Sequence, residues 1–459
     1  MARAKKEADL TPEERLQAAL VPDWDWPYKL PENWCWTKIG SISSLHRGVS
    51  YKKTDAHTER RENSCLVMRG GNICEGSIDT EADNIYVDIS LVAENQIVRK
   101  NDIIIVASTG STKVIGRAGI SKMDYLDVAF GAFLLLVRPS TKVNQRYIDY
   151  FFLSDNYRNR IKKLASGINI NNIRGEYITE TLVPLAPLAE QQRIVDRIES
   201  LFAKLDEAKE KAQAVVDSFE TRKAAILHKA FTGELTKKWR KSANTRWVYK
   251  KIKDCCKLGS GGTPSRKVPD FYKGDIPWIK TGEIEWNDIY DTEEKITQSA
   301  IDNSSARCYK PGVVLVAMYG MGVTRGKASI LRVQAATNQA VCVLEPQSAL
   351  LYNRYLLYYF MRNYWDIREK AVGGNQLNLS LTIIKELNIE IPPIDEQMEI
   401  VQILDDLFAK EQQAKESAEA VLDQIDLMKK SILARAFRGE LGTNDPSEES
   451  AMELLKRVL

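Results

Sequence analysis

Two stretches of this chain have nearly the same sequence, and no other feature constrains its fold as strongly. Residues 190–235 and 396–441 align without a gap at a constant offset of 206 residues, and 23 of the 46 aligned positions are identical. Both stretches end in the pattern A-F-x-G-E-L. Because chance similarity between helical segments rarely gives so dense an ungapped match, the repeat indicates a duplicated architecture.

The segments that precede these stretches also match, although more weakly. The pairs are 66–73 with 277–284, 102–110 with 312–320, 117–120 with 327–330, and 167–171 with 374–378. We therefore expect the order globular domain, long helix, globular domain, long helix. Since the helical copies agree far better than the globular ones, the helices are predicted to share one role and the globular domains to have diverged.

Apolar residues in both helical stretches recur in alternating steps of four and three. This heptad pattern, sustained over about five repeats, predicts that the two helices pair along their length. The residues assigned to the seam are Ile198, Leu201, Leu205, Ala208, Ala212 and Val215 in the first helix and Leu404, Leu407, Ala414, Ala418 and Val421 in the second. Arg222 and Glu411 interrupt the two seams, and Gly233 and Gly439 are predicted to end the helices.

Such helices could pair within one chain or between two chains. Two copies in one chain can satisfy each other, and a pseudo-twofold relation between tandem halves requires opposed helices. We therefore favour an intramolecular antiparallel pair over a homodimeric coiled coil. At 1.5 Å rise per residue, about 45 residues make a rod about 65 Å long, which would hold two globular domains apart in inverted orientation.

The predicted domain boundaries follow from this pattern. They are an N-terminal helical docking segment at 1–27, a first α+β domain at 28–186, its helix at 187–236, a second α+β domain at 237–392, its helix at 393–441, and a tail at 442–459. In the first segment, Thr11, Pro12 and Glu14 predict the start of a short helix, because they suit the N-cap, first and third helical positions.

The charge balance excludes some classes of protein. The 459 residues include 65 Lys and Arg against 62 Asp and Glu, a difference of +3, which excludes a histone-like polycation. DNA binding stays open, because it needs one basic face and not a basic whole. The longest apolar run, 130–137, is much shorter than a membrane span, and seven cysteines with three histidines are a poor zinc donor set. The sequence predicts a reduced, cytoplasmic, metal-free protein outside any membrane.

Cationic and amide side chains gather in the loops around the predicted strands. The candidates for DNA contact are Arg47, Lys52, Lys53, Arg69, Asn72, Lys113 and Arg117 in the first domain and Arg266, Lys267, Lys280, Arg325, Lys327 and Asn338 in the second. Lys and Arg neutralise phosphates, while Arg, Asn and Gln can hydrogen-bond base edges in the major groove. For any one of them a solvated surface charge is the simpler interpretation; as groups, they predict contact with double-stranded DNA.

The signatures of catalysis are missing from the sequence. Residues 320–328 look like a phosphate-binding loop, but Met321 stands where the Walker pattern needs glycine and Ala328 where it needs Ser or Thr. No G-x-S-x-G, H-E-x-x-H or Asn/Asp-Pro-Pro-aromatic stretch is present. The chain is therefore predicted to be non-catalytic and to carry no cofactor of its own.

Several short motifs occur together in a specific order. They are L-P-E-N-W at 30–34, G-G-T-P-S at 261–265, G-D-I-P-W-I at 274–279, N-Q-A-V at 338–341, G-N-Q-L-N at 374–378 and I-P-P-I-D-E-Q at 391–397. With the two helices, they make residues 28–441 resemble the specificity subunit of type I restriction–modification systems. The first domain departs from the pattern: residues 50–52 stand where G-T-P is expected, and residues 130–132 where N-Q-A is expected.

This resemblance implies two pseudo-twofold-related target-recognition domains, separated by a long antiparallel two-helix coiled coil. Each domain would recognise one half of a bipartite, asymmetric DNA sequence, and the helices would set the spacer. The implied partners are two modification subunits, which bind S-adenosylmethionine and methylate adenines, and two restriction subunits, which use ATP and Mg²⁺. The family's setting is host defence in the cytoplasm of a bacterium or archaeon.

The helices and chain ends would dock the modification subunits. Pseudo-symmetry would place the N-terminal segment beside the tail, where residues 445–448 are expected to start another short helix. Two alternatives stay open. One is a recognition subunit whose partner fuses methylation and cleavage in one chain, and the other is a coiled-coil protein without sequence-specific DNA binding. A free-standing enzyme is disfavoured by the missing motifs.

Overall fold

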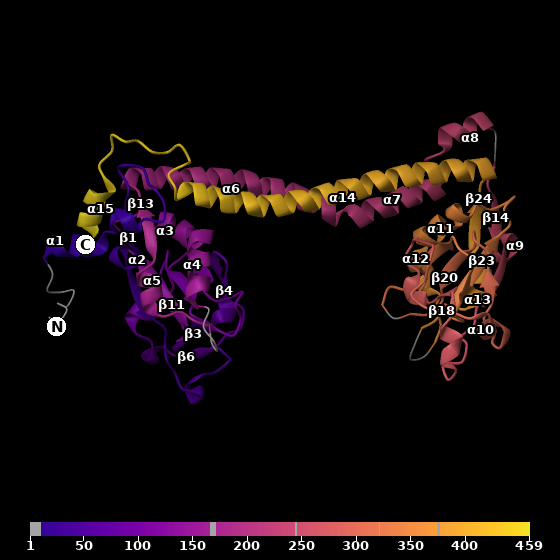
Figure 1. The fold of residues 1–459 in the computed structure, drawn as a ribbon, viewed down its shortest axis with the longest axis horizontal. Helices are drawn as coiled ribbons and strands as arrows, with labels where there is room; N and C mark the ends of the chain where they lie inside the picture. Colours follow the sequence, from indigo (N-terminus) through magenta and orange to yellow (C-terminus); the bar gives the residue numbers. More distant parts are fainter. Residues whose placement is uncertain (1–10, 166–170, 244–245, 321, 374–376) are drawn as a thin grey trace. The chain divides into compact units, whose positions relative to one another are not determined.

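The computed structural model describes residues 11–165, 171–243, 246–320, 322–373 and 377–459 (Figure 1). The chain divides into two compact units: unit 1 is Met1–Lys211 with Val421–Leu459, and unit 2 is Ala212–Ala420. The division passes through the paired long helices, whereas the predicted boundaries set these helices apart as separate domains. Each unit therefore contains one globular domain together with one part of the helix pair.

Unit 1 is built on two sheets with helices on one side (Figure 1). The first sheet has the antiparallel order β2 (Ser43–Arg47), β11 (Leu134–Pro139), β7 (Ile103–Val106) and β9 (Ala118–Ile120). The second has the order β10 (Val128–Phe130), β3 (Ser64–Met68) and β6 (Tyr86–Asp88), and its β10–β3 pair is parallel. The remaining elements are α1 (Pro12–Ala19), β1 (Cys35–Lys38), α2 (Ile39–Ile42), β4 (Ile73–Cys74), β5 (Ser77–Ile78), β8 (Ser108–Thr109), α3 (Gln145–Phe152), α4 (Asp155–Ala165), β12 (Asn171–Asn172), α5 (Gly175–Thr179) and β13 (Leu182–Leu185).

Unit 2 repeats this arrangement and has one additional edge strand in each sheet, β17 (Asp288–Ile289) in the first and β19 (Cys308–Tyr309) in the second. Its first sheet is β15 (Cys256–Ser260), β23 (Val341–Pro346), β20 (Val314–Ala317), β21 (Ala328–Leu331) and β17. Its second is β18 (Lys295–Ile296), β16 (Ile276–Ile279), β22 (Ala335–Thr337) and β19, with a parallel β16–β22 pair. The others are α8 (Lys237–Ala243), β14 (Val248–Lys251), α9 (Ile252–Cys255), α10 (Gln298–Asp302), α11 (Asn353–Arg362), α12 (Tyr364–Glu369), α13 (Leu381–Lys385) and β24 (Asn388–Ile391). The α+β class and the duplication of the globular domains are confirmed.

The central strand of each unit is apolar throughout because both of its faces are buried. In unit 1, Ile103 and Ile105 of β7 pack among residues of the helices, while Ile104 and Val106 pack against the second sheet. Strand β20 of unit 2 divides its side chains between two cores in the same way. Burial on both faces favours continuous runs of β-branched and aliphatic residues over an alternating pattern.

The long helices are α6 (Leu188–Asp217), α7 (Phe219–Phe231) and α14 (Ile394–Ala436). The first predicted helix is thus broken at Ser218, whose hydroxyl hydrogen-bonds the Ala214 carbonyl oxygen, and the second is continuous. Gly233 and Gly439 follow α7 and α14 with φ of +74° and +73°. Their role in ending the helices is confirmed, because this left-handed conformation suits glycine best.

The helices pair antiparallel inside each unit. In unit 1, Lys209 of α6 contacts Asp426 of α14 (Nζ–Oδ1 3.2 Å), while Lys429 contacts Asp206, so the partner's number falls as the residue number rises. In unit 2, Arg222 of α7 contacts Glu411 (Nε–Oε2 2.6 Å). The intramolecular antiparallel pairing is confirmed in both units, and the two predicted interruptions of the seam prove to be partners.

The seam itself needs one correction. Ile198, Ala212, Leu404 and Ala418 are buried, and Leu201, Leu205, Ala208, Val215 and Leu407 are half-buried, as predicted. Ala414 and Val421 are exposed instead, and the neighbouring residues Lys415 and Leu422 are half-buried. Lys415 lies over the ring of Phe219 (4.9 Å). A lysine stem can cover an apolar surface while its ammonium stays hydrated, so a pattern that counts Lys as polar misses the position.

The two chain ends meet in unit 1. Helix α1 has the predicted capping box between Thr11 and Glu14. The last helix, α15 (Ala451–Val458), packs against it, and Ala19 and Leu455 belong to one core. The pairing of the ends is therefore confirmed for residues from Thr11 onward. The tail helix starts at Ala451, not at the predicted 445–448, because Ser450 supplies its N-cap.

Some predictions fall outside the described residues. These are positions 1–10 of the docking segment, Met321, and residues 167–170 and 374–376 of the repeated motif near the end of each domain. Among the helices that the structure does describe, none combines the length and the apolar character needed to cross a bilayer.

Candidate nucleic-acid interface

Four chain segments meet at one edge of unit 1. The N–H of Gly131, after β10, donates to the Met68 carbonyl oxygen at the end of β3 (2.9 Å). The N–H groups of Ala107 and Ser108, after β7, both donate to the Phe133 carbonyl oxygen (3.0 Å each). Arg47 ends β2 opposite Leu135. We call Arg47, Arg69, the loop 107–117 and the turn 131–133 the recognition edge of unit 1.

Unit 2 has an edge of the same construction. The N–H of Asn338 donates to the Ile279 carbonyl oxygen at the end of β16 (3.0 Å). The N–H of Met318 donates to the Ala340 carbonyl oxygen (2.9 Å). Lys280, the loop 318–327 and the turn 338–340 therefore form the recognition edge of unit 2. The sheet registers bring predicted DNA contacts from distant parts of the sequence to one edge in each unit.

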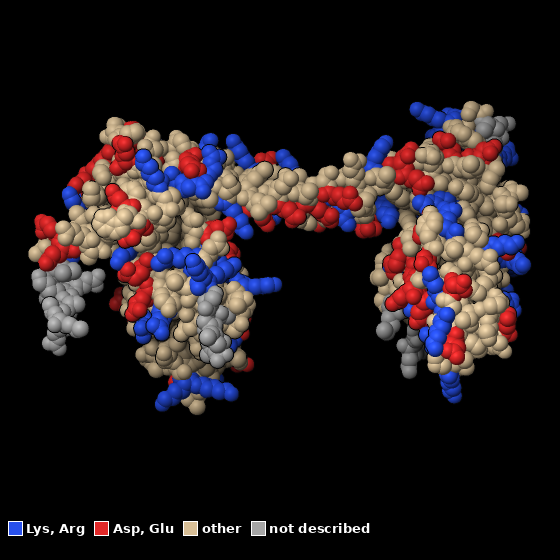
Figure 2. Space-filling model, in the orientation of Figure 1, with Lys and Arg blue, Asp and Glu red and all other residues tan. Residues whose placement is uncertain are grey.

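The predicted cations of unit 1 differ in how far they are engaged by the fold. Figure 2 shows Lys and Arg side chains on the globular part of unit 1 below α6 and at its lower end, with Asp and Glu among them. Arg69 pairs with Asp83, and Arg117 donates to the Ile73 carbonyl oxygen (3.0 Å). The cations that are exposed and form no ion pair with another described residue are Arg47, Lys52, Lys53 and Lys113.

In unit 2 most of the predicted cations already have acidic partners. Arg266 pairs with Glu294 (Nη2–Oε2 2.6 Å) and lies over the Tyr272 ring (4.0 Å), and this pairing lowers the pKa of Glu294. Lys280 contacts Glu293 (3.1 Å), and Lys327 contacts Glu285. Lys267 is exposed. A phosphate would have to compete with these carboxylates, so unit 2 has less unpaired positive charge than unit 1 among its predicted contacts.

Two predicted residues are engaged by hydrogen bonds within the fold: Asn72 is buried, and Arg325 is half-buried. Asn72 is fully buried; its Nδ2 donates to the Asp79 carbonyl oxygen (2.9 Å) and its Oδ1 accepts from the Arg69 N–H (2.7 Å). Arg325 donates to the Leu377 carbonyl oxygen, and burial together with the neighbouring Arg368 lowers its pKa. We remove Asn72 from the candidate interface, because its amide holds the loop and is not exposed to a ligand.

An arginine from a helix supports the long loop of each recognition edge. In unit 1, Arg158 of α4 donates to the carbonyl oxygens of Ile115 (2.8 Å) and Lys113 (3.2 Å). In unit 2, Arg368 of α12 donates to those of Arg325 (2.6 Å) and Gly322 (2.7 Å). The two arginines occupy matching positions, yet sequence analysis missed both, since an arginine on a helix usually indicates a solvated face.

Glycines mark the same point in the two loops. Gly116 and Gly326 have φ of +71° and +90°. The Gly116 N–H donates to the carbonyl oxygen of Val106, and the Gly326 N–H to that of Ala317 (2.8 Å each); these are the last residues of the strands before the loops. A left-handed residue at this point turns the chain back toward the next strand. The shared glycine was the sequence signal that could have located the arginine supports.

The short turns of the two edges carry different side chains. The hydrogen bonds above match Gly131 with Asn338 and Phe133 with Ala340. The predicted match, which placed Phe130 at Asn338, is therefore wrong by one residue. Phe133 is 69% exposed, whereas Ala340 is 8% exposed. The first turn presents an aromatic ring, and the second presents the amides of Asn338 and Gln339.

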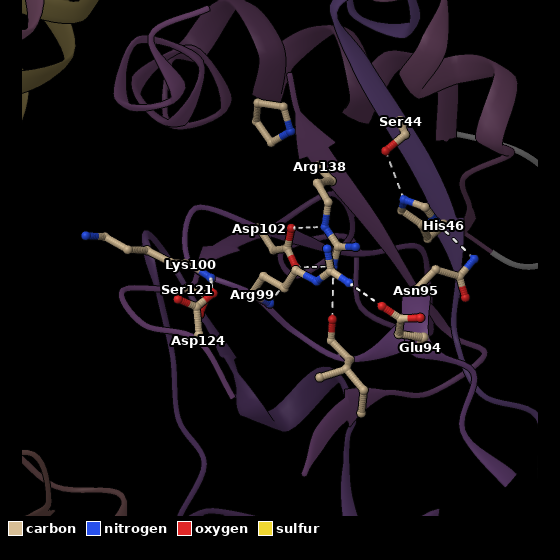
Figure 3. A network of polar contacts seen from close by, with 12 residues as sticks. Ser44, His46, Glu94, Asn95, Arg99, Lys100, Asp102, Ser121, Asp124 and Arg138 are labelled. Carbon is tan, nitrogen blue, oxygen red and sulfur yellow. Dashed lines mark hydrogen bonds and ion pairs between the residues drawn. The ribbon is translucent and has the colours of Figure 1, made fainter. Parts of the chain in front are cut away.

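A separate polar network lies beside β2 and β11 of unit 1 (Figure 3). Arg138 donates to both carboxylate oxygens of buried Asp102 (2.7 and 2.6 Å), which also accepts from the Arg99 N–H. Ser44 contacts His46, whose pKa is lowered by burial and by Arg138. The network borders a cavity of about 690 Å³. Since the Asp102 oxygens are already bonded, we assign the network to fastening strand ends and not to catalysis.

The loop that resembles a phosphate-binding loop has a different setting. A Walker loop leads from a strand into a helix, whose N-terminus faces the phosphates. Residues 318–327 instead connect two antiparallel strands, β20 and β21. The described part of this loop therefore lacks the strand-to-helix setting of a Walker loop.

Comparison with known proteins decides the family. Residues 31–216 and 244–420 match the family described as Type I restriction modification DNA specificity domain. The chain belongs to this family. It is 29% identical to the type I restriction enzyme EcoKI specificity subunit of Escherichia coli K12, over 94% of this chain and 96% of that protein. It is 27% identical to the StySPI specificity subunit of Salmonella potsdam, over 90% of each.

Two solved structures share the fold of this specificity subunit. The HsdS subunit from Thermoanaerobacter tengcongensis matches with a TM-score of 0.60 at 18% identity, over 90% of this chain and 99% of that chain. A chain from a study of complex assembly and conformational transition of the type I restriction–modification system matches with a TM-score of 0.64 at 17% identity, over 90% and 100%. Both matches extend over nearly the whole chain, in agreement with the duplicated α+β fold.

Proposed function

We propose that each unit of this type I specificity subunit recognises one half of a bipartite, asymmetric DNA sequence through its recognition edge. One observation carries the proposal. The two units share the order of their common strands, the arginine support of the long loop and the backbone hydrogen bonds of the short turn, but their exposed side chains differ at matching positions. A shared framework with divergent exposed residues is the arrangement expected of two sites that bind different sequences of one polymer.

The antiparallel helices would set the number of base pairs between the two half-sites. A lysine over a phenylalanine ring joins the helices within each unit, and the ion pair between the polar seam residues Arg222 and Glu411 supports their alignment in unit 2. Tandem units related by a pseudo-twofold axis would suit half-sites separated by a fixed spacer. This spacer role and the pseudo-twofold relation are part of the proposal.

Catalysis would belong to the partners. Two modification subunits would bind S-adenosylmethionine and methylate one adenine on each strand, and two restriction subunits would use ATP and Mg²⁺ to move and cleave DNA. An adenine must leave the helix to be methylated, a step that we assign to the modification subunits, while the recognition edges would supply phosphate and base contacts. The described helices and paired chain ends would supply the docking surface for the modification subunits.

A domain exchange tests the proposal. Residues 30–180 would be replaced by the matching unit of a related subunit, and the chimaera would be expressed with its modification subunits. Sequencing of the methylated adenines should show one half-site changed and the other unchanged. A change in both half-sites, or in neither, would contradict the assignment of one half-site to each unit.

Helix length tests the spacer role separately. Insertion of one heptad into α6 and one into the facing part of α14 should widen the spacer and leave both half-sites intact. Insertion into only one helix is the matched control, because it breaks the pairing without lengthening the pair. An unchanged spacer after the matched insertion would contradict the spacer role of the helices, but it would not contradict recognition of one half-site by each unit.

A further inference from the structure

Phe133, in the turn 131–133 of unit 1, is a large aromatic residue whose side chain is exposed to solvent. Its side chain is 69% exposed, and apart from Trp24 it is the one large aromatic side chain that is exposed in the described part of unit 1. An isolated exposed apolar residue is ordinary on a protein surface. Phe133 is different because it lies in the middle of a recognition edge that otherwise consists of cationic and polar groups.

The turn that carries Phe133 is held by its backbone. The Phe133 carbonyl oxygen accepts from the N–H groups of Ala107 and Ser108 (3.0 Å each), and the Leu134 N–H donates to the Gly131 carbonyl oxygen (2.9 Å). Gly131 is also bonded to Met68. With both ends of the turn bound to neighbouring strands, the ring is presented from a fixed position, so little conformational entropy is lost on binding.

The charged residues around this turn indicate what covers the ring. Arg69 directly follows Met68, Lys113 and Arg117 belong to the loop that begins at Ala107, and Arg47 ends the strand beside β11. Of these, Arg47 and Lys113 are exposed and form no ion pair with another described residue, so both suit contact with a phosphate backbone beside the turn. The residue in the middle then faces the groove between the phosphates, where the base edges lie.

The matching turn of unit 2 indicates which part of the groove is approached. Asn338 and Gln339 occupy it, and such amides pair with base edges in the major groove. In unit 1 the same turn is Gly131, Ala132 and Phe133, which offers no polar side chain. The major-groove feature that is apolar is the 5-methyl group of thymine.

We propose that Phe133 recognises the 5-methyl group of a thymine in the half-site that unit 1 binds. This inference rests on the proposed function, and it makes the two units differ in kind: apolar contact in unit 1 and amide hydrogen bonding in unit 2. It assigns to Phe133 a specificity role in which the ring contacts a base edge and does not open the base stack.

Replacement of thymine by deoxyuridine tests the proposal. The specific site would first be taken from the methylated motif, and the subunit would be assembled with its modification subunits. Binding would then be measured to duplexes in which each thymine of the first half-site is changed in turn. Loss of one buried methyl contact should weaken binding by about fourfold at one position.

The variant Phe133→Ala completes the cycle. It should weaken binding to the thymine duplex by about tenfold, and the deoxyuridine substitution should then have no further effect, because the two changes remove one contact. Leu126→Ala is the matched control: Leu126 is 88% exposed but precedes β10, at the opposite end of that strand from the turn, and its loss should leave binding unchanged.

Three outcomes would overturn the inference. They are a first half-site without thymine, a Phe133→Ala variant that binds like the wild type, and additive effects of the variant and deoxyuridine, as expected for a ring that wedges between bases. In each case recognition of the second half-site should persist. If neither half-site were recognised by the wild-type complex, the proposed function itself would fail.

Discussion

Units 1 and 2 both bury a glutamate acceptor where a long helix joins the globular domain, but they differ at their recognition edges. Glu190 and Glu396, which are 206 residues apart, are both fully buried acceptors. Trp34 Nε1 donates to Glu190 (2.7 Å), and Thr236 Oγ1 donates to Glu396 (2.7 Å). The buried glutamate thus recurs in both units, whereas the exposed residues of the two recognition edges differ.

The helix pair shows the duplication most directly. In unit 1, Lys429 lies over the ring of Phe202 (5.0 Å), and in unit 2, Lys223 lies over the ring of Phe408 (5.6 Å). Both partners of the first pair are offset by 206 residues from those of the second, and the helices have exchanged roles. The same lysine–phenylalanine contact is thus made once in each unit.

The largest effect is expected from the buried glutamates. Glu396→Ala should lower the stability of unit 2 by about 3–5 kcal/mol, because it leaves the Arg240 guanidinium without its buried partner. Glu190→Ala removes a carboxylate that accepts hydrogen bonds only from neutral donors. It should therefore lower the stability of unit 1 by about 2–4 kcal/mol. Hydrogen exchange resolved by peptide would report each unit separately. Replacement of the exposed Glu207 by alanine is the control. An equal loss of stability in both units from a single variant would contradict the assignment of one buried glutamate to each unit.

A buried carboxyl group, Asp149, should make unit 1 less stable as the pH rises toward neutrality, an effect that unit 2 does not share because it has Leu357 there. Burial raises the pKa of Asp149 to about 7, although the nearby Arg146 acts in the opposite direction and lowers it. Unit 2 has buried Leu357 at the matching position. An acid with a raised folded-state pKa binds its proton more tightly when folded, so the stability present near pH 4 is lost as the pH rises through 7. A shift of about three pKa units corresponds to at most about 4 kcal/mol.

Asp149→Leu checks this sign. The variant should be more stable than the wild type at pH 8 and should lose the pH dependence of unit 1 between pH 4 and pH 7, as followed by denaturant unfolding with exchange readout. Asp149→Asn, which keeps the shape, should also flatten the profile. A wild-type unit 1 whose stability rises from pH 5 to pH 8 would contradict the assignment.

The polar pair of the helix seam gives a smaller effect. Positions equivalent to Arg222 and Glu411 in unit 1 are Met428 and Leu205, 206 residues away in each case. Arg222→Met or Glu411→Leu alone should cost about 1–2 kcal/mol, because each leaves a half-buried charge unpaired. The double variant should be within about 0.5 kcal/mol of the wild type. A double-mutant cycle on thermal unfolding would measure this, and strictly additive losses would refute the pairing.

The smallest effect is expected from the loop supports. Arg158→Ala should weaken binding of the assembled complex to its site by about tenfold, because the loop 107–117 loses two backbone hydrogen bonds, each contributing about 1 kcal/mol or less. DNA altered in the first half-site should show little further loss, and Arg368→Ala should behave likewise for the second half-site. Arg160→Ala, on the exposed side of α4, is the control.

Sequence patterns were sufficient wherever one residue type does one job. The repeat predicted the duplicated units, Gly233 and Gly439 predicted the helix ends, and the capping residues Thr11 and Glu14 predicted α1. The patterns were insufficient where a polar side chain can be either solvent-exposed or packed in the fold. Lys415 was passed over for the seam because its charge masks its aliphatic stem, and Asn72 was taken for a DNA contact because nothing in the sequence shows that its amide is buried.

The sequence by itself determined the duplication, the heptad pairing and the family, since these depend on periodicity and on residue order. The tertiary structure alone decided which residues share an edge. Arg47, Arg69 and Phe133 are brought together by strand register and by three backbone hydrogen bonds, and contacts between positions so far apart in the chain leave no local signal. The same long-range packing decided that Glu411 would meet Arg222 and that Asp149 would be buried.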